Sequence, residues 1–549
     1  MKKFFLRYPA ASAAILMFIA LAPIMAMRDF TPGNELRYLN IADEALADGH
    51  LFTFTNQGEP YADKPPLYFW LMMLLRTVFG RHCMFALSLL SFIPATVIMS
   101  VMDRWYASAS GDSGFLSRFA SSMMLGTSAL FLGTSLFLRM DMMMCMFIVL
   151  ALYSFYKLYT GKGRGKVHGF LLPVCIFLAL FAKGPVGLLV PPAAIAVFLA
   201  MEGKIRDIGK YLGWKTWGII AMLCAIWFTG VRIEGGWPYL ENLLFHQTVD
   251  RAVDAFHHKE PFWYYAVAVS YVFAPYSILL IIVFFSEFGH GISGSGNFCE
   301  KSMRRLSVSV TACTFVMLSS FSSKLSIYLL PIFPFMTCLL PLVSGRFRWR
   351  AWHTAALMIP ASVFVLAGTG GIAILVTHCI PALEMYGFAW SPCVWTALAV
   401  LASGGVISMI LVLKSRSWQL PVISIATTML LCTATMSAVL PQANDYIGYR
   451  NVCRTAETMA SGLPCDTGYV TLSVFRPVNM NVYLHKDITD FGKDVRAYLD
   501  SSLGPHVLIV KTSVAVHDPE LYDRLLGTVP EQVGEYSLYL MPGSPALRP

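Results

Sequence analysis

Charged residues are scarce in this chain of 549 residues. Asp, Glu, Lys and Arg together make up 13% of it, about half the share that soluble globular domains carry. Hydrophobic residues make up 56%, and the mean hydropathy is +0.60. The composition excludes a soluble globule and predicts an α-helical polytopic membrane protein.

Metal-binding cysteine patterns and internal repeats are also missing. The twelve cysteines show no spacing such as Cys-x-x-Cys, and most lie in apolar runs, where cysteine is usually a small buried residue. Cys453 and Cys465 lie in a more polar region, and the sequence leaves open whether they pair or remain thiols. The absence of repeats disfavours many secondary transporters.

The basic residues lie in short clusters between apolar runs. The net charge of +9 would suit a nucleic-acid partner, but such clusters are typical of residues that set membrane topology, so no nucleic-acid partner is expected. Thirteen runs have about the length needed to cross a bilayer: 9–27, 83–101, 119–138, 142–159, 168–182, 186–201, 216–231, 263–286, 307–322, 325–344, 353–377, 392–412 and 419–440.

The basic clusters fall on alternate loops between these runs, which predicts that those loops face the cytoplasm. The basic start and the first apolar run resemble a signal peptide, but further apolar runs follow throughout, so we expect a signal anchor. The C-terminal part is then expected on the outer, non-cytoplasmic side of the membrane.

Two domains are expected. Residues 1–440 form the transmembrane domain, in which 28–82 make a large non-cytoplasmic loop. In this loop, 31–50 read as an amphipathic helix, and 65–80 read as a short interfacial helix that does not cross. Residues 441–549 alternate strand-like runs with polar helical stretches, which predicts a small α/β domain.

Polar side chains gather at the outer ends of the expected spans: Glu35, Arg37, Asp63, Lys64, Arg139, Asp141, Lys183, His257, His258 and Lys324. Each has a simpler explanation alone. The lysines suit interfacial anchors, Arg139 with Asp141 suits a salt bridge in a hairpin, and the histidines suit a solvated loop. Because charges at membrane helix ends are costly unless paired or hydrated, their common placement predicts a site.

Several of these segments resemble a known family in order and spacing. They are GNELRYLNIADEAL, YADKPPLYFWL, RMDMMM, KGPVGLLVP, HHKEPFWYY and SSKLSIYLLPIFP, within roughly residues 5–345. The family is the aminoarabinose (4-amino-4-deoxy-L-arabinose) lipid A transferases, a branch of the polyprenyl-phosphate-dependent type C glycosyltransferases related to protein O-mannosyltransferases. The resemblance implies a type C glycosyltransferase fold and an enzyme of the bacterial inner membrane. Such an enzyme would move a sugar from undecaprenyl phosphate to a lipid A-like, glycan or other envelope acceptor at the periplasmic face of the lipid membrane.

One position departs from the family pattern. Asn34-Glu35 stands where the family usually has Asp-Glu, whose Asp is the expected catalytic carboxylate. Asn34 cannot accept a proton at neutral pH. Either Glu35 or Asp141 therefore takes the catalytic role, or this branch is inactive; the other matching residues favour an active enzyme.

The resemblance and the residue chemistry together assign roles. Glu35 and Asp141 are expected to orient or deprotonate the acceptor. Asn34, which precedes Glu35, is expected to lie in the same catalytic site. Substrate binding is expected from Arg37, Lys64, Arg139, Lys183, Lys324 and Tyr328, with the lysines on the leaving phosphate. A divalent metal ion, zinc or magnesium, is expected if Asp63, His257 and His258 converge.

Three alternatives stay open from the sequence. A transporter or flippase of lipid-linked sugars would also have many spans, but it predicts charges near the bilayer midplane and often repeats. A protein O-glycosyltransferase of the same fold would differ only in its acceptor. A catalytically dead binding protein would account for Asn34.

Overall fold

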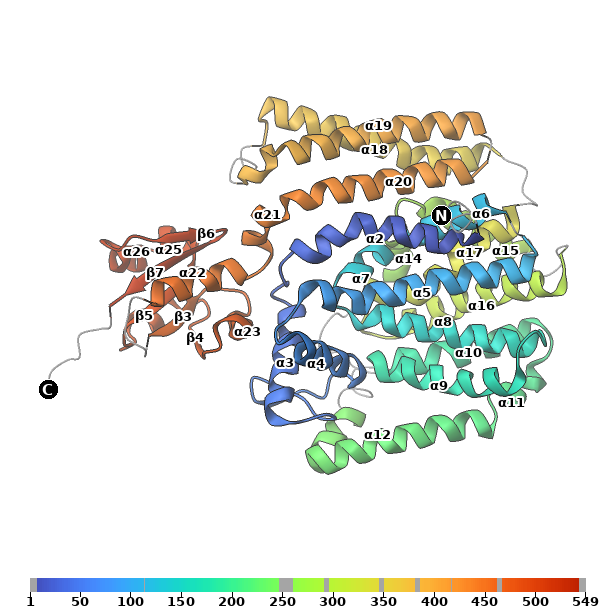
Figure 1. The fold of residues 1–549 in the computed structure, drawn as a ribbon, viewed down its shortest axis with the longest axis horizontal. Helices are drawn as coiled ribbons and strands as arrows, with labels where there is room; N and C mark the ends of the chain where they lie inside the picture. The colour runs from blue at the N-terminus through green and yellow to red at the C-terminus, as the bar shows by residue number, and fades with distance from the viewer. Residues whose placement is uncertain are drawn as a thin grey trace.

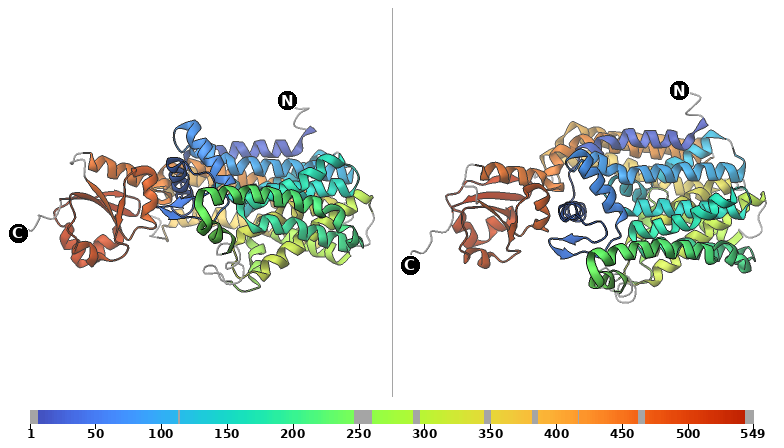
Figure 2. Two further views of the ribbon diagram at one scale, coloured as in Figure 1. Left: turned by 90° about the horizontal axis from the view of Figure 1, so that it is seen from below. Right: turned by 60° about the horizontal axis from the view of Figure 1, so that its bottom comes forward.

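A long helical bundle carries a small α/β domain at one end (Figure 1). The computed structural model describes residues 7–112, 114–245, 260–290, 296–344, 350–380, 386–415, 417–461 and 467–542. The first helix, Pro9–Met27, begins at the end of the bundle away from the α/β domain (Figure 2). The protein is a multi-pass helical membrane protein, as the composition predicts.

The bundle is built from apolar helices, most of which are long and run along one axis (Figure 1), although one pair is bent by 67° at its break. In chain order they are α2 (Pro9–Met27), α5 (Met84–Ser110), α6 (Phe115–Thr127), α7 (Ala129–Leu136), α8 (Met140–Tyr159), α9 (Gly165–Lys183), α10 (Pro185–Met201), α12 (Trp214–Glu241), α14 (Tyr264–Val272), α15 (Ser277–His290), α16 (Phe298–Ser320), α17 (Phe333–Ser344), α18 (Ala351–Thr377), α19 (Pro392–Ser415) and α20 (Gln419–Met436). Shorter segments are η1 (Ile205–Asp207), α11 (Ile208–Tyr211), η3 (Ser326–Ile332) and η5 (Gly387–Trp390). Helices α18 and α19 form an outer layer next to α20 (Figure 1).

In the described ranges, nine helices are long and apolar enough to cross a membrane, or ten if the bent pair α6 and α7 counts as one span. The expected number of about thirteen is therefore higher than length and composition support. The other three expected spans fall on short, broken or more polar helices. Run 186–201 is α10, with 17 residues; run 263–286 is divided between α14 and α15; and run 307–322 belongs to α16, whose first turns carry several charges.

The first loop holds two helices at the α/β-domain end of the bundle. Helix α3 (Glu35–Asp48) packs on α4 (Leu67–Phe79), and a small hairpin of β1 (Thr55–Asn56) and β2 (Glu59–Pro60) lies between them in the chain. Asp43 on α3 pairs with Arg76 Nε at 3.1 Å and with His82 Nε2 at 2.8 Å. Helix α4 has 13 residues, about 20 Å at 1.5 Å per residue, and is too short to span about 30 Å of hydrocarbon.

The C-terminal domain is a mixed sheet with short helices, as the strand-like runs predict. Its elements are α21 (Leu440–Ile447), which follows η6 (Ser437–Val439), α22 (Arg450–Ala460), β3 (Gly468–Leu472), η7 (Pro477–Met480), α23 (Asn481–Leu484), β4 (Ile488–Asp490), α24 (Val495–Leu499), β5 (His506–Lys511), α25 (Thr512–His517), α26 (Pro519–Leu525), β6 (Glu531–Val533) and β7 (Tyr536–Met541). The strand order is β4-β3-β5-β7-β6, with β3 parallel to β4 and β5 and with β7 antiparallel to its neighbours. Cys453 is buried in α22, and Cys465 lies outside the described residues.

Candidate functional site

Asp141 and Lys183 form an ion pair at the α3 end of the bundle. Asp141 lies in the first turn of α8 and is 2% exposed, while Lys183 is the last residue of α9. An acid at a helix N-terminus and a base at a helix C-terminus both suit the helix dipoles. Lys183 Nζ also lies 4.8 Å from the ring centroid of Tyr328, on η3. Three segments distant in sequence therefore meet at this pair.

The end of α9 is set by a glycine. Gly184 has φ +120° and ψ −157°, a region that residues with a Cβ rarely adopt. The chain turns at this residue, and Pro185 starts α10 directly afterwards. The order Lys-Gly-Pro thus fixes where Lys183 stands.

A second ion pair lies close to the first. Lys64 Nζ is 2.8 Å from Asp63 Oδ2, which also accepts a 3.0 Å hydrogen bond from the Tyr61 hydroxyl. Asp63, Lys64 and Arg139 are near enough to Lys183 to interact with it electrostatically. We name these residues the cationic cluster: Asp63, Lys64, Arg139, Asp141, Lys183 and Tyr328.

The cationic cluster has one more positive than negative side chain. Three cations (Lys64, Arg139 and Lys183) face two carboxylates. Within the described chain, the Arg139 guanidinium has no hydrogen-bond or ion-pair partner, although its backbone N–H lies 3.5 Å from Ser91 Oγ. The arrangement is suited to an anionic ligand such as a phosphate.

Glu35 lies next to this cluster but is fully engaged. Arg28 binds it in a bidentate manner, with Nη1 2.7 Å from Oε2 and Nη2 2.6 Å from Oε1. The Thr31 N–H and hydroxyl donate to Oε2 at 2.9 and 3.0 Å, and the Leu138 N–H donates to Oε1 at 2.8 Å. Five donors meet a carboxylate that has about four lone-pair positions. No acceptor site on Glu35 is left for a substrate proton.

The electrostatic balance keeps Glu35 ionised. Burial disfavours the charged form, but the Arg28 guanidinium and the N–H groups of Thr31 and Leu138 outweigh burial and hold the pKa of Glu35 below its ordinary value. Sequence reasoning missed Arg28, which is 3% exposed. The available signal was an arginine directly after the first apolar run and seven residues before Glu35.

Asn34 and Arg37 form a neighbouring contact. Arg37 Nη2 donates to Asn34 Oδ1 at 2.8 Å, and the guanidinium carbon lies 5.7 Å from the centroid of the Tyr61 ring. Because Tyr61 donates to Asp63, this contact connects to the cationic cluster. The Nε of Arg37 is buried and has no partner among the described residues.

Lys324 is directed to backbone carbonyls. It is 4% exposed and donates to Phe321 O at 2.6 Å and to Glu260 O at 2.9 Å. Two of its three donors are thus used to hold the end of α16 against the segment that precedes α14. Among the described residues, the hydrogen bonds of Lys324 go to these carbonyls and not to the cationic cluster.

The expected metal ligands are only partly described. His257 and His258 lie outside the described residues. Among those that the structure covers, no three His, Cys, Asp or Glu side chains are grouped to hold a metal ion. Asp63, the third expected ligand, is engaged by Lys64 and Tyr61.

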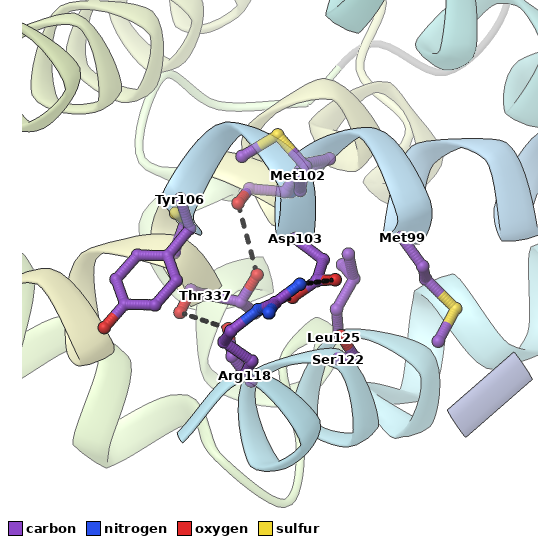
Figure 3. A pocket seen from close by; sticks show the side chains of 11 residues that line it. Met99, Met102, Asp103, Tyr106, Arg118, Ser122, Leu125 and Thr337 are labelled. Atoms are coloured by element: carbon purple, nitrogen blue, oxygen red, sulfur yellow. Dashed lines mark hydrogen bonds and ion pairs between the residues drawn. The ribbon is translucent and has the colours of Figure 1, made fainter. Parts of the chain in front are cut away.

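A buried ion pair at the other end of the bundle has a different character. Asp103 on α5 and Arg118 on α6 make two hydrogen bonds of 2.7 and 2.6 Å beside Tyr106 and Thr337 (Figure 3). The adjoining cavity is about 10 Å³, room for about one water molecule. This pair therefore joins two helices and leaves no space for a substrate.

A larger hollow lies between the first-loop helices and the C-terminal domain. Its volume is about 530 Å³, and its lining includes Asn40, Asp43 and Arg76 from the loop, with Asn481 and His485 from the domain. This volume is in the range of ligand pockets. Sequence reasoning did not predict it, because its two walls are more than 400 residues apart in the chain.

Comparison with known families finds a partial match. Residues 63–228 match the family Dolichyl-phosphate-mannose-protein mannosyltransferase, and this segment includes every member of the cationic cluster except Tyr328. An uncharacterized protein of Aquifex aeolicus is 24% identical over 310 residues, 55% of this chain and 57% of that protein. The undecaprenyl phosphate-alpha-4-amino-4-deoxy-L-arabinose arabinosyl transferase of Edwardsiella ictaluri is 24% identical over 356 residues, 63% of this chain and 61% of that protein. The matches thus span less than two thirds of these relatives.

The fold agrees over nearly the whole chain with a solved structure. ArnT from Cupriavidus metallidurans, in a crystal structure bound to undecaprenyl phosphate, superposes with a TM-score of 0.70 over 97% of both chains, at 16% identity. The resemblance predicted from the sequence motifs is confirmed. The chain therefore shares the fold of ArnT over nearly its whole length, and residues 63–228 are similar to the mannosyltransferase family.

Proposed function

We propose that this chain is a glycosyltransferase that moves a sugar from undecaprenyl phosphate to a lipid A-like or other envelope acceptor at the periplasmic face of a bacterial inner membrane. The observation that carries the proposal is the cationic cluster, which lies almost entirely in the segment that matches the mannosyltransferase family. The undecaprenyl phosphate bound to ArnT supports a lipid phosphate as the leaving group.

The phosphate side of the reaction is assigned to Lys64 and Arg139. As the bond between sugar and phosphate oxygen breaks, negative charge grows on the phosphate, and fixed cations stabilise that state more than the ground state. Arg139 suits this role because its guanidinium is not engaged by other described residues and presents a planar fork to phosphate oxygens.

The acceptor side is assigned to Asp141. Its Oδ1 is held by Lys183, and its Oδ2 has no hydrogen-bond partner among the described residues. A carboxylate with one fixed and one available oxygen is able to orient an acceptor group and take up its proton. Glu35, whose oxygens are occupied by five donors, is assigned to positioning the first loop.

Asn34 and a metal ion have no step in this scheme. Asn34 is neutral, and we assign it to orienting Arg37, to which it is hydrogen-bonded. A zinc or magnesium ion held by Asp63, His257 and His258 would add a positive charge near the donor phosphate, but the described residues supply only Asp63.

The test compares envelope glycans in cells with and without the protein. Mass spectrometry of lipid A and other envelope glycoconjugates should show one glycoform lost without the protein and restored by the wild type and by Arg496→Gln, an exposed control. Asp141→Asn should not restore it. Unchanged glycans together with impaired movement of a lipid-linked sugar across the membrane would contradict the proposal and support a flippase.

A further inference from the structure

The C-terminal domain is bonded directly to the segment that leads into α3. Asn444 Nδ2 donates to Met27 O at 2.7 Å, and its Oδ1 accepts from the Asp29 N–H at 2.9 Å. Further along, Asn479 donates to Pro32 O at 2.7 Å and Arg476 to Gly33 O at 3.2 Å. These bonds hold residues 27–33 along their whole length.

Asp29 is the centre of this contact. It is 1% exposed, and its Oδ1 accepts from the Tyr483 hydroxyl at 2.7 Å. Its Oδ2 accepts from the Arg450 N–H at 2.8 Å, and the Arg450 side chain lies 3.5 Å from Oδ1. A carboxylate from the bundle is thus enclosed by donors from the domain, and hydrogen bonds to a buried charge are among the stronger ones in proteins.

Two further features preserve this contact. A Cβ at Gly448 would lie 2.2 Å from Asp29 Oδ2, so only glycine allows the chain to approach so closely. Burial and the Asp29 carboxylate raise the pKa of Tyr483 above its ordinary value, so its hydroxyl remains protonated and donates.

From Asp29 the bonds continue to the candidate site. The preceding residue, Arg28, forms the ion pair with Glu35 and also donates to Leu136 O at 3.2 Å. Glu35 in turn accepts a hydrogen bond from the Leu138 N–H. Leu138 is three residues before Asp141. A set of buried polar contacts therefore runs from the C-terminal domain through Asp29, Arg28 and Glu35 to Leu138, two residues before α8 begins.

We propose that Asp29 is a positioning residue through which the docked C-terminal domain holds Arg28, Glu35 and the start of α8 in the geometry that the cationic cluster requires. The domain is then a structural part of the site, although it supplies no group to the cationic cluster. The kinetic consequence of this proposal rests on the proposed glycosyl transfer, whereas its structural consequence does not.

The structural test is hydrogen exchange on the full-length protein in detergent. Tyr483→Phe removes a single hydroxyl from the contact, and Asp29→Asn replaces its charge. Both should speed exchange in peptides covering residues 30–36 and 136–142 by about 10-fold or more, the scale expected when a hydrogen bond to a charged group is lost. Arg496→Gln, in the same domain but 82% exposed, should leave these peptides unchanged.

The kinetic test is a split between kcat and KM. Misplacing reacting groups by about 1 Å costs up to about 100-fold in rate, so Tyr483→Phe should lower kcat by about 10-fold and change KM for the undecaprenyl-phosphate sugar by less than about 2-fold. Unchanged exchange in both variants would overturn the proposal, as would faster exchange with wild-type kcat. If the wild type transfers no sugar, the proposed function fails, and the exchange experiment still decides the docking role.

Discussion

Replacing Glu35 by glutamine separates a structural role from a catalytic one. In the native protein, Glu35 is 2% exposed and its partner Arg28 is 3% exposed. Glutamine keeps one carbonyl oxygen but places an amide N–H₂ against donors, either those of Arg28 and Leu138 or those of Arg28 and Thr31. The substitution leaves the Arg28 charge buried without a counterion.

The expected loss follows from this geometry. Removing one partner of a buried ion pair costs about 3–5 kcal/mol of folding free energy, because the remaining charge is uncompensated. Glu35→Gln should therefore lower the midpoint of thermal unfolding in detergent, followed by tryptophan fluorescence, well beyond the effect of Glu520→Gln. Glu520 belongs to an exposed pair with Arg496 at 3.8 Å, and such pairs contribute about 0–1 kcal/mol.

A double variant tests the cause. Arg28→Met with Glu35→Leu removes both charges, so it should recover the part of the stability that the uncompensated Arg28 charge costs in Glu35→Gln, although the N–H groups of Thr31 and Leu138 still lose their acceptor. The reasoning would be refuted if Glu35→Gln unfolded like the wild type and still lost sugar transfer. That result would instead support Glu35 as the catalytic carboxylate.

Four further outcomes are expected. Asp141→Asn removes the counterion of Lys183 and should lower the thermal midpoint, and it should also lower kcat by about two to four orders of magnitude in folded protein assayed for transfer from undecaprenyl-phosphate sugar; wild-type kcat would exclude the assigned acceptor role. Lys64→Ala should weaken both undecaprenyl phosphate binding and turnover, and Lys64→Arg should rescue only part of each; wild-type affinity in the alanine variant would make Lys64 a topology anchor. The pKa of Glu35 is below its ordinary value of 4.5, so the stability that Glu35 contributes is present above about pH 5 and is lost as the pH falls through the lowered pKa. Thermal unfolding measured at a series of acidic pH values should therefore show a smaller drop in midpoint for Glu35→Gln than for the wild type. If His257 and His258 hold a metal ion with Asp63, a chelator should lower activity and added zinc should restore it; full activity in the chelator would exclude an exchangeable metal.

The architecture follows largely from the order of residues. Apolar runs that need about 20 residues to cross a bilayer are local in sequence, and the alternating strand-like runs after residue 440 are local too, so both the helical bundle and the α/β domain were predictable. Of the thirteen expected spans, nine or ten coincide with helices of the described residues that are long and apolar enough to cross, and the sequence does not show that run 263–286 breaks into α14 and α15. The sequence predicted that Asp141 and Lys183 lie at the same membrane face, but it did not predict that they form an ion pair.

What tertiary structure alone decided is the partner of each buried polar group. Glu35 is engaged by Leu138, 103 residues away, and Asp29 by Tyr483, 454 residues away. Lys324 was expected to bind the phosphate, but in the structure it donates hydrogen bonds to backbone carbonyls. The sequence shows which residues are charged and which of them lie in apolar segments. It does not show which oppositely charged residue will pair with a buried charge in the folded protein. That choice depends on how helices distant in sequence pack against one another, and no local pattern contains it.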